Sequence, residues 1–282
     1  MKKAIVNYVF WVVLLSFGLV LGVANADIYE GLMGHWTFDD GEGTTADDIS
    51  GNEHHGTLNG DPQWVDGWIN GALEFDGVDD EVDVPYSADL NPEDSFTLTA
   101  WANADSGRSG HGAVISCRDD YPQRGYIIYA EPGNTWQFWI GIGTGWNAAQ
   151  GPSVRLDEWV HVAAVYSAGT QRFYVDGEFV GEASGTVSVN PGQELLIGAG
   201  ENETATHNFF FQGAIDEVRV YNRALSDDEV LEVYNWTGGA YAGPDQSVEA
   251  GDTVTLDGSG PPDATSFTWE QVIIADEPVV AL

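Results

Sequence analysis

The chain has 282 residues, of which 45 are acidic and nine are basic, so its formal net charge at neutral pH is −36. This charge makes nucleic acid and anionic membrane surfaces poor partners, because both would be repelled. With 43% hydrophobic residues the chain can bury a large core, and its single cysteine, Cys117, excludes an intramolecular disulfide.

The first 26 residues have the features of a secretory signal peptide. Lys2 and Lys3 precede a long apolar run, and small residues around Ala24 and Ala26 suit a signal peptidase. Cleavage after Ala26 would leave a secreted or cell-surface chain with seven arginines, no lysine, 45 acidic residues and a net charge of −38. Such a charge suits a salty medium or calcium, although plain solubility explains it equally well. The alternative is an uncleaved membrane anchor, since the run is nearly long enough to span a bilayer. No later segment could span a membrane.

Short apolar segments recur between glycine-rich turns along the next 200 residues, which predicts an all-β sandwich or barrel. The expected strands are 34–38, 72–75, 96–103, 113–117, 126–130, 136–140, 159–166, 171–175, 178–182, 194–199 and 214–221. The clearest hairpin turns at Asp176 and Gly177, a pair that can adopt the positive φ angles of a type I′ turn.

The last of these strands raises a question about Asp216. Side chains alternate between the two faces of a strand, so Asp216 is expected to face the core together with Ala214, Val218 and Val220. The opposite face carries residues expected to meet solvent, namely Ile215, Glu217, Arg219 and Tyr221. An isolated buried carboxylate is costly, so it must be neutralised, paired or bound to a metal.

One helix is expected after the final strand. Ser226 and Glu229 have the spacing of a capping box, and an apolar stripe follows until Gly238. This helix of about two turns is expected to seal one end of the sandwich. The composition changes at 239–282, where two strands and a turn would be too few to bury a core of their own. The natural protein is therefore expected to be longer.

The motifs together resemble a LamG-like (laminin-G, concanavalin A-like) domain over about 30–235. They are HWTFDDGEG at 35–43, DISGN at 48–52, HGTL at 55–58, ALEFDG at 72–77, FTLTAW at 96–101, WVHVAAVY at 159–166, FYVDG at 173–177 and GAIDEVRVYNRALS at 213–226. AGPDQ at 242–246 and VTLDGSG at 254–260 are similar to the start of a PKD-type immunoglobulin-like repeat. The expected domains are thus a signal peptide (1–26), a LamG-like domain (27–238) and a partial PKD-like module (239–282).

The resemblance implies a two-sheet antiparallel jelly-roll sandwich whose first and last strands are neighbours. It also implies non-catalytic recognition of an extracellular glycan or surface protein, within a longer chain of modules. Many relatives carry calcium, an ion that takes six to eight oxygen ligands. Neighbouring terminal strands would bring Asp216 close to Asp39 and to the loop that begins at Asp48. We therefore predict a structural calcium ion held by Asp39, Asp48 and Asp216. The alternative is that loop amides donate hydrogen bonds to Asp216 without any metal.

Two further stretches of the sequence are acidic. The cluster around Asp76 and Asp79 could hold a second ion, but such a cluster is more often a solvated turn. The stretch EVDVPY at 81–86 is similar to the catalytic strand of laminarinase-like hydrolases, which pair two carboxyl groups. Here Tyr86 stands where the acid/base would be, and Pro85 should end the strand. The histidines show no zinc spacing, His161 is expected to be packed, and no nucleophile motif is present, so we expect no enzymatic activity.

Two segments are predicted to be binding loops, 118–124 and 143–151. Trp146 has no apolar periodicity around it and could stack on a sugar ring, unless it folds back onto the sandwich. The predicted ligand-binding residues are Trp146, Asn147, Gln150, Tyr121, Arg118 and Arg124. Trp136 and Trp139 stand three apart on a strand, so one of them should be in the core. A glycan-binding module, a protein-adhesion module and a spacer all remain open.

Overall fold

The computed structural model describes residues 28–108, 110–131, 133, 135–201 and 206–238. The predicted signal peptide and the predicted PKD-like module therefore lie outside the described residues. Within the described part, no helix has the length and apolar character needed to cross a membrane.

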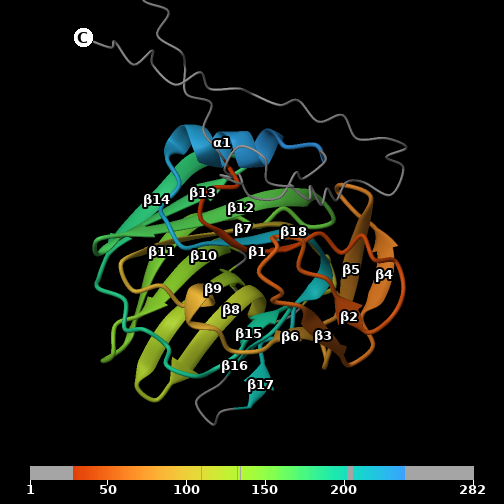
Figure 1. Ribbon diagram of the computed structural model, residues 1–282, viewed down its shortest axis with the longest axis horizontal. Helices are drawn as coiled ribbons and strands as arrows, with labels where there is room; N and C mark the ends of the chain where they lie inside the picture. Colours follow the sequence, from red (N-terminus) through yellow and green to blue (C-terminus); the bar gives the residue numbers. More distant parts are fainter. Residues whose placement is uncertain (1–27, 109, 132, 134, 202–205, 239–282) are drawn as a thin grey trace, which may run out of the picture.

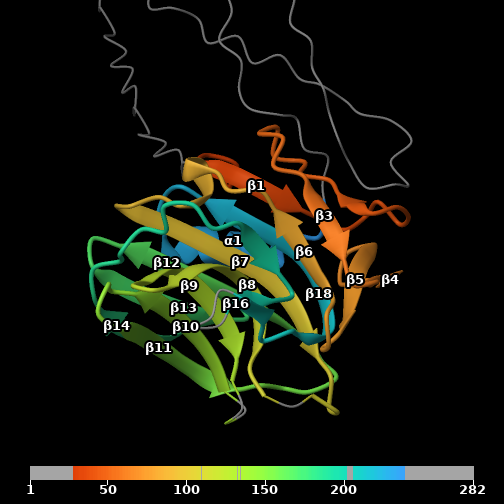
Figure 2. The ribbon, with the colours of Figure 1, turned by 90° about the horizontal axis from the view of Figure 1, so that it is seen from below.

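Two antiparallel sheets pack face to face (Figures 1 and 2). Sheet A has the order β14 (Glu178–Ser184), β13 (Thr170–Val175), β12 (Trp159–Ser167), β7 (Ser95–Ala104), β18 (Gln212–Tyr221), β5 (Gly71–Asp76) and β4 (Gln63–Asp66), and β1 (Leu32–Trp36) also pairs with β18. Sheet B has the order β11 (Trp146–Ser153), β10 (Thr135–Gly141), β9 (Gln123–Ala130), β8 (Gly112–Asp120), β15 (Leu195–Ile197), β6 (Glu81–Val84), β3 (Gly56–Asn59) and β2 (Thr45–Ala46). The remaining elements are the strand pair β16 (Gly200–Glu201) and β17 (His207–Asn208), the 3-10 helix η1 (Ala88–Leu90) and the helix α1 (Asp227–Asn235). The predicted all-β sandwich with one short helix is confirmed.

The main core lies between the sheets and is rich in aromatic side chains. Trp36, Trp136 and Phe138 are fully buried there, and each such side chain contributes roughly 1.5–3 kcal/mol by leaving water. The prediction that one tryptophan of the 136/139 pair belongs to the core is confirmed, because Trp139 points the other way. Cys117 is also in this core, where burial raises the pKa of its thiol to about 12. It is a packing residue and not a nucleophile.

The first and last strands are neighbours, as predicted. Leu32 of β1 is paired with Tyr221 of β18, and Trp36 is paired with Val218. A buried network strengthens this junction: the Glu217 carboxylate lies 2.7 Å from His35 Nε2 and 2.7 Å from Arg219 Nη2.

The predicted faces along β18 are wrong for Ile215 and Asp216, whereas Val218 and Val220 face the core as predicted. The register shifts between Asp216 and Arg219, where Glu217 adopts a φ of 53° and forms a β-bulge. Because of the extra residue, Ile215 and Val218 both face the core, whereas Asp216 lies on the outer side of sheet A. Asp216 is nevertheless fully buried.

The predicted hairpin and capping box are confirmed. Asp176 and Gly177 have φ angles of 51° and 76°, as a type I′ turn requires. Ser226 accepts a hydrogen bond from the Glu229 amide, and the Glu229 carboxylate accepts one from the Ser226 amide.

The predicted position of the helix is wrong. Val230 and Val233 pack on Ala163 and Tyr174, so α1 covers the outer face of sheet A and does not seal an end of the sandwich (Figure 1). The reason lies in the strands beneath it, which are apolar on both faces.

Candidate functional site

The outer face of sheet B carries a group of aromatic side chains that we call the aromatic face. It consists of Tyr129, Trp139, Trp146 and Phe209, supported by Ala113 and Ile127. The ring centroids of Trp139 and Trp146 lie 6.4 Å apart, those of Tyr129 and Trp139 6.1 Å, and those of Tyr129 and Phe209 5.7 Å. Both tryptophans are only partly buried. Aromatic side chains with a polar tip and an accessible ring are suited to ligand contact.

Strand register explains why these residues gather. Trp139 of β10 lies directly opposite Ile127 of β9, so both point away from the core, while their neighbours Trp136 and Phe138 point inward. Trp146 begins β11 opposite Gly141, a position without a side chain that could cover the indole.

Arg118 of β8 lies at the centre of the aromatic face. Its guanidinium carbon is 4.6 Å from the centroid of the Trp146 ring and 5.4 Å from that of Phe209. It donates a hydrogen bond to the Tyr129 hydroxyl at 2.6 Å and forms an ion pair with Asp120. The Trp146 Nε1 group donates to the same Asp120 carboxylate at 3.2 Å. Cation–π contacts and a shared carboxylate thus fix the indole in one orientation.

Two polar atoms at this centre lack a partner. Arg118 and Asp120 are 6% and 4% exposed, and neither Arg118 Nε nor Asp120 Oδ2 makes a hydrogen bond within the described part of the chain. Unmet polar atoms cost about 1–3 kcal/mol each when they are buried. Both atoms are buried beneath the rings, so the surface that this centre offers to a ligand is the accessible part of the Trp139 and Trp146 side chains.

The structure brings some of the predicted ligand-binding residues together. Arg118 and Trp146 are in direct contact, and Gln150 lies on the same face of β11 as Trp146. Asn147 points to the other side, where it donates to the Ser184 carbonyl oxygen. Arg124 also lies on the other side, 3.5 Å from Asp119.

Tyr121 stands apart from the aromatic face. It lies at the tip of the β8–β9 hairpin and is 84% exposed. The two segments predicted as loops are largely strands, because 118–124 spans this hairpin and 146–153 forms β11. Pairing with β10 outweighs the weak strand propensity of the glycine, asparagine and alanine residues in β11.

Sequence reasoning missed Tyr129, Phe209 and Asp120 as members of the site. Tyr129 could have been found, since alternation places it on the side of Ile127. Phe209 could not, because it adopts a φ of 54° after β17 and reaches the site from outside the strand pattern.

A group of acidic residues continues the outer face of sheet B beside the aromatic face, and we call it the acidic edge. It consists of Glu81, Asp83, Glu194 and Glu201, with His207 among them. His207 Nδ1 lies 2.7 Å from Glu81, and Nε2 lies 2.9 Å from Glu194. Partial burial opposes the charge on His207, but the two carboxylates outweigh this effect and raise its pKa.

On the hydrolase-like strand, Glu81 Oε1 lies 2.7 Å from His207 Nδ1, and Glu81 Oε2 has no partner among the described residues. As predicted, β6 ends before Pro85, and Tyr86 lies outside the strand with 40% of its surface exposed. His161 is fully buried, and burial lowers its pKa to about 3, which confirms that it is a packed residue.

The three acids predicted to hold calcium are not assembled around one point. Asp48 is saturated by local donors: it accepts hydrogen bonds from the amides of His35, Ser50 and His54 and from the Ser50 hydroxyl. Asp39 accepts from the Gly71 amide at 2.8 Å. Their carboxylate oxygens and that of Asp216 do not form a group within 4.8 Å of one another.

Asp216 itself accepts a hydrogen bond from the Ile69 amide at 2.9 Å. Its other oxygen has no partner among the described residues. Burial, together with the neighbouring charge of Glu217, raises the pKa of Asp216 to about 9, so the carboxyl group is neutral at pH 7.

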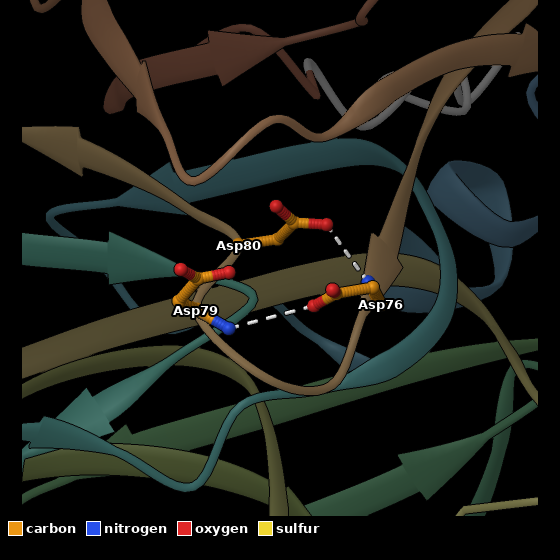
Figure 3. A group of neighbouring side chains, drawn as sticks. All are labelled: Asp76, Asp79 and Asp80. Atoms are coloured by element: carbon orange, nitrogen blue, oxygen red, sulfur yellow. Dashed lines mark hydrogen bonds between the residues drawn. The ribbon is translucent and has the colours of Figure 1, made fainter.

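The second acidic cluster has the closer geometry. One carboxylate oxygen from each of Asp76, Asp79 and Asp80 lies within 4.8 Å of the others (Figure 3). Asp80 accepts hydrogen bonds from the amides of Asp61 and Asp76, at 2.7 and 2.9 Å, so its side chain is fixed by the turn. The hard oxygen donors suit calcium, but hydrogen bonds within the turn account for the same geometry.

Comparison with known proteins identifies the class. The model of the concanavalin A-like lectin/glucanases superfamily matches residues 76–231, more than half of the chain, and the chain belongs to this family. No curated protein matches the sequence.

Solved structures share the fold at low sequence identity. The binding domain of Paraclostridial Mosquitocidal Protein 1 is 16% identical with a TM-score of 0.59, over 74% of this chain and 53% of that one. Domain 4 of AbnA, an extracellular arabinanase of Geobacillus stearothermophilus solved with arabinotriose, is 20% identical with a TM-score of 0.57, over 72% and 98%. The binding domain of Botulinum Neurotoxin DC, solved with SialylT, is 14% identical with a TM-score of 0.58, over 74% and 52%. The chain thus matches only about half the length of the two toxin binding domains.

Proposed function

We propose that this protein is an exported, non-catalytic carbohydrate-binding module that holds a glycan on its aromatic face. The observation that carries the proposal is the pair of half-buried indoles of Trp139 and Trp146, whose ring centroids lie 6.4 Å apart, with the Trp146 ring held in place by Arg118 and Asp120. A sugar ring offers an apolar face for stacking and hydroxyl groups that both donate and accept. The fold is shared with domains whose structures were solved with arabinotriose and with SialylT, which supports a glycan as the ligand.

A non-catalytic role agrees with the carboxylates of sheet B. Hydrolysis of a glycosidic bond needs two carboxyl groups facing one substrate, one of them free to donate a proton. In the hydrolase-like stretch, Tyr86 stands where the acid/base would be, and one Glu81 oxygen is hydrogen-bonded to His207. Asp120 is paired with Arg118. The proposal also includes three predictions from the sequence. They are that the protein is exported, that it belongs to a longer chain with further modules, and that it binds a structural calcium ion. For calcium, Asp76, Asp79 and Asp80 offer the better donor geometry.

The test compares three tryptophan variants of the full chain on a glycan array and then by affinity electrophoresis. Trp146→Ala and Trp139→Ala should weaken retention of the bound glycan roughly 5- to 30-fold, which corresponds to about 1–2 kcal/mol of lost stacking. Trp68→Ala is the matched control, because Trp68 is 47% exposed but stacks on Trp101 of β7, in the other sheet. Circular dichroism verifies that all three variants are folded.

Retention that survives both Trp146→Ala and Trp139→Ala, or that is lost equally in Trp68→Ala, contradicts the aromatic face as the binding site. The absence of any retained glycan would favour the alternative predicted from the sequence, a protein-adhesion or spacer module.

A further inference from the structure

We infer that the acidic edge makes the aromatic face selective for uncharged and amino sugars and excludes glycans that carry carboxylate or sulfate groups. The inference rests on the glycan binding proposed above and adds the chemical class of the ligand. It is carried by the distribution of charge over the outer face of sheet B.

The acidic edge and the aromatic face lie on the same side of sheet B. Residues directly opposite one another in antiparallel strands point to the same side, and one such row crosses the sheet from β10 to β6. It runs through Trp139, Ile127, Ser116, Leu196 and Asp83. The middle of this row is covered, because Ile127, Ser116 and Leu196 are at most 3% exposed. The two groups adjoin at β16 instead, where a Cβ atom at Gly200, the residue before Glu201, would lie 3.4 Å from the Phe209 ring and 3.6 Å from the Tyr129 hydroxyl oxygen.

The cations on this surface are already engaged. Arg118 is paired with Asp120 beneath the indole, and the His207 ring is shared by Glu81 and Glu194. Arg108, near the end of β9, donates to the carbonyl oxygens of Gly110, Ala130 and Glu131. None of these groups is placed to balance an additional anion.

Carboxylates outnumber the cations on the described part of this face. Five of them, namely Glu81, Asp83, Asp120, Glu194 and Glu201, stand against three basic side chains, Arg108, Arg118 and His207. Burial already raises the pKa values of Glu81, Asp83 and Glu201, so these groups carry a desolvation cost that a further negative charge would increase. An ammonium group would lower that cost, and a neutral hydroxyl would leave it unchanged.

The test sorts the retained glycans by charge at 0.15 M salt and repeats the measurement with Glu194→Gln and Glu201→Gln. Wild type should retain uncharged or amino glycans and reject their sialylated, uronated and sulfated counterparts. Each glutamine variant should improve the binding of an acidic glycan about fourfold relative to that of its neutral counterpart. This is the effect expected from removing one of two unit charges that lie roughly 8 Å apart at a protein surface and are screened over one Debye length. Glu178→Gln is the charge-matched control, since Glu178 is exposed on β14 of sheet A.

A second measurement decides the inference without a sugar. Caesium and iodide ions quench tryptophan fluorescence, and the difference between wild type and Trp146→Phe isolates Trp146. Relative to the quenching of free N-acetyltryptophanamide by each ion, caesium should quench this component more efficiently than iodide, with acrylamide as the neutral reference. A larger relative quenching by iodide, or equal retention of acidic and neutral glycans by wild type, overturns the inference. If no glycan is retained, the proposed function fails, while the quenching order still shows whether the surface repels anions.

Discussion

Asp216 offers the sharpest test of how this fold accommodates a buried acid. In the folded chain its pKa is raised to about 9, whereas an aspartate in an unfolded chain has a pKa of about 3.9. Between these values the native state holds one proton more than the unfolded state, so the free energy of unfolding decreases as the pH rises, by about 1.4 kcal/mol per pH unit. At pH 7, about three units above 3.9, the ionisable group costs about 4 kcal/mol relative to a neutral side chain of the same shape.

Asp216→Asn should remove this cost. The amide oxygen can still accept the Ile69 hydrogen bond, and asparagine carries no charge to bury. Denaturant unfolding should find the variant and wild type about equal at pH 4, with the variant more stable by up to about 4 kcal/mol at pH 7. Asp47→Asn, at a side chain that is 58% exposed, should show no such pH-dependent gain. A variant that is less stable than wild type at pH 7 would refute the reasoning, because it would mean that Asp216 is ionised and partnered, for example by a cation.

Three other predictions follow from local geometry. Because the pKa of His207 is raised, its ion pairs stabilise the fold fully below about pH 6.5 and are lost as the pH rises through the folded-state pKa. His207→Gln should therefore lower the melting temperature at pH 6 but not at pH 9. An equal loss at both pH values would contradict this. Calcium added to chelated protein should raise the melting temperature, and Asp76→Asn should abolish that rise; an unchanged wild type would rule out the ion. A Cβ atom at Gly125, where φ is +78°, would lie 1.8 Å from the Cys117 carbonyl oxygen. Gly125→Ala should therefore lower the free energy of unfolding by at least about 3 kcal/mol, as measured by chemical denaturation. Gly145→Ala should lower it far less, because no atom lies within 4 Å of the added Cβ.

Much of the fold could be predicted because it depends on short-range rules. The Asp176–Gly177 turn and the Ser226 capping box are local patterns with one stable geometry each, and both were found in the structure as expected. The pairing of β1 with β18 came from the resemblance to a known family, since no local pattern reports a contact between strands about 180 residues apart.

The candidate site was harder to predict because it depends on register. Glu217 adopts a positive φ without the glycine that usually marks a bulge, so the change of face at Asp216 left no signal in the sequence. Trp146 was predicted to be a binding residue, but its strand was not predicted, because β11 gains its stability from β10 and not from its own residues. Phe209 joins the site only through the tertiary fold, where its ring stacks edge-on against Tyr129.

The pairing of β1 with β18 has a mechanical consequence. Leu32, at the start of β1, is paired with Tyr221, at the end of β18. A force that separates the two ends of this domain therefore acts across the strands and loads their hydrogen bonds one after another. Tension would therefore peel β1 away from Leu32 toward Trp36 at low load, and the first groups drawn apart would include His35 and its carboxylate partner.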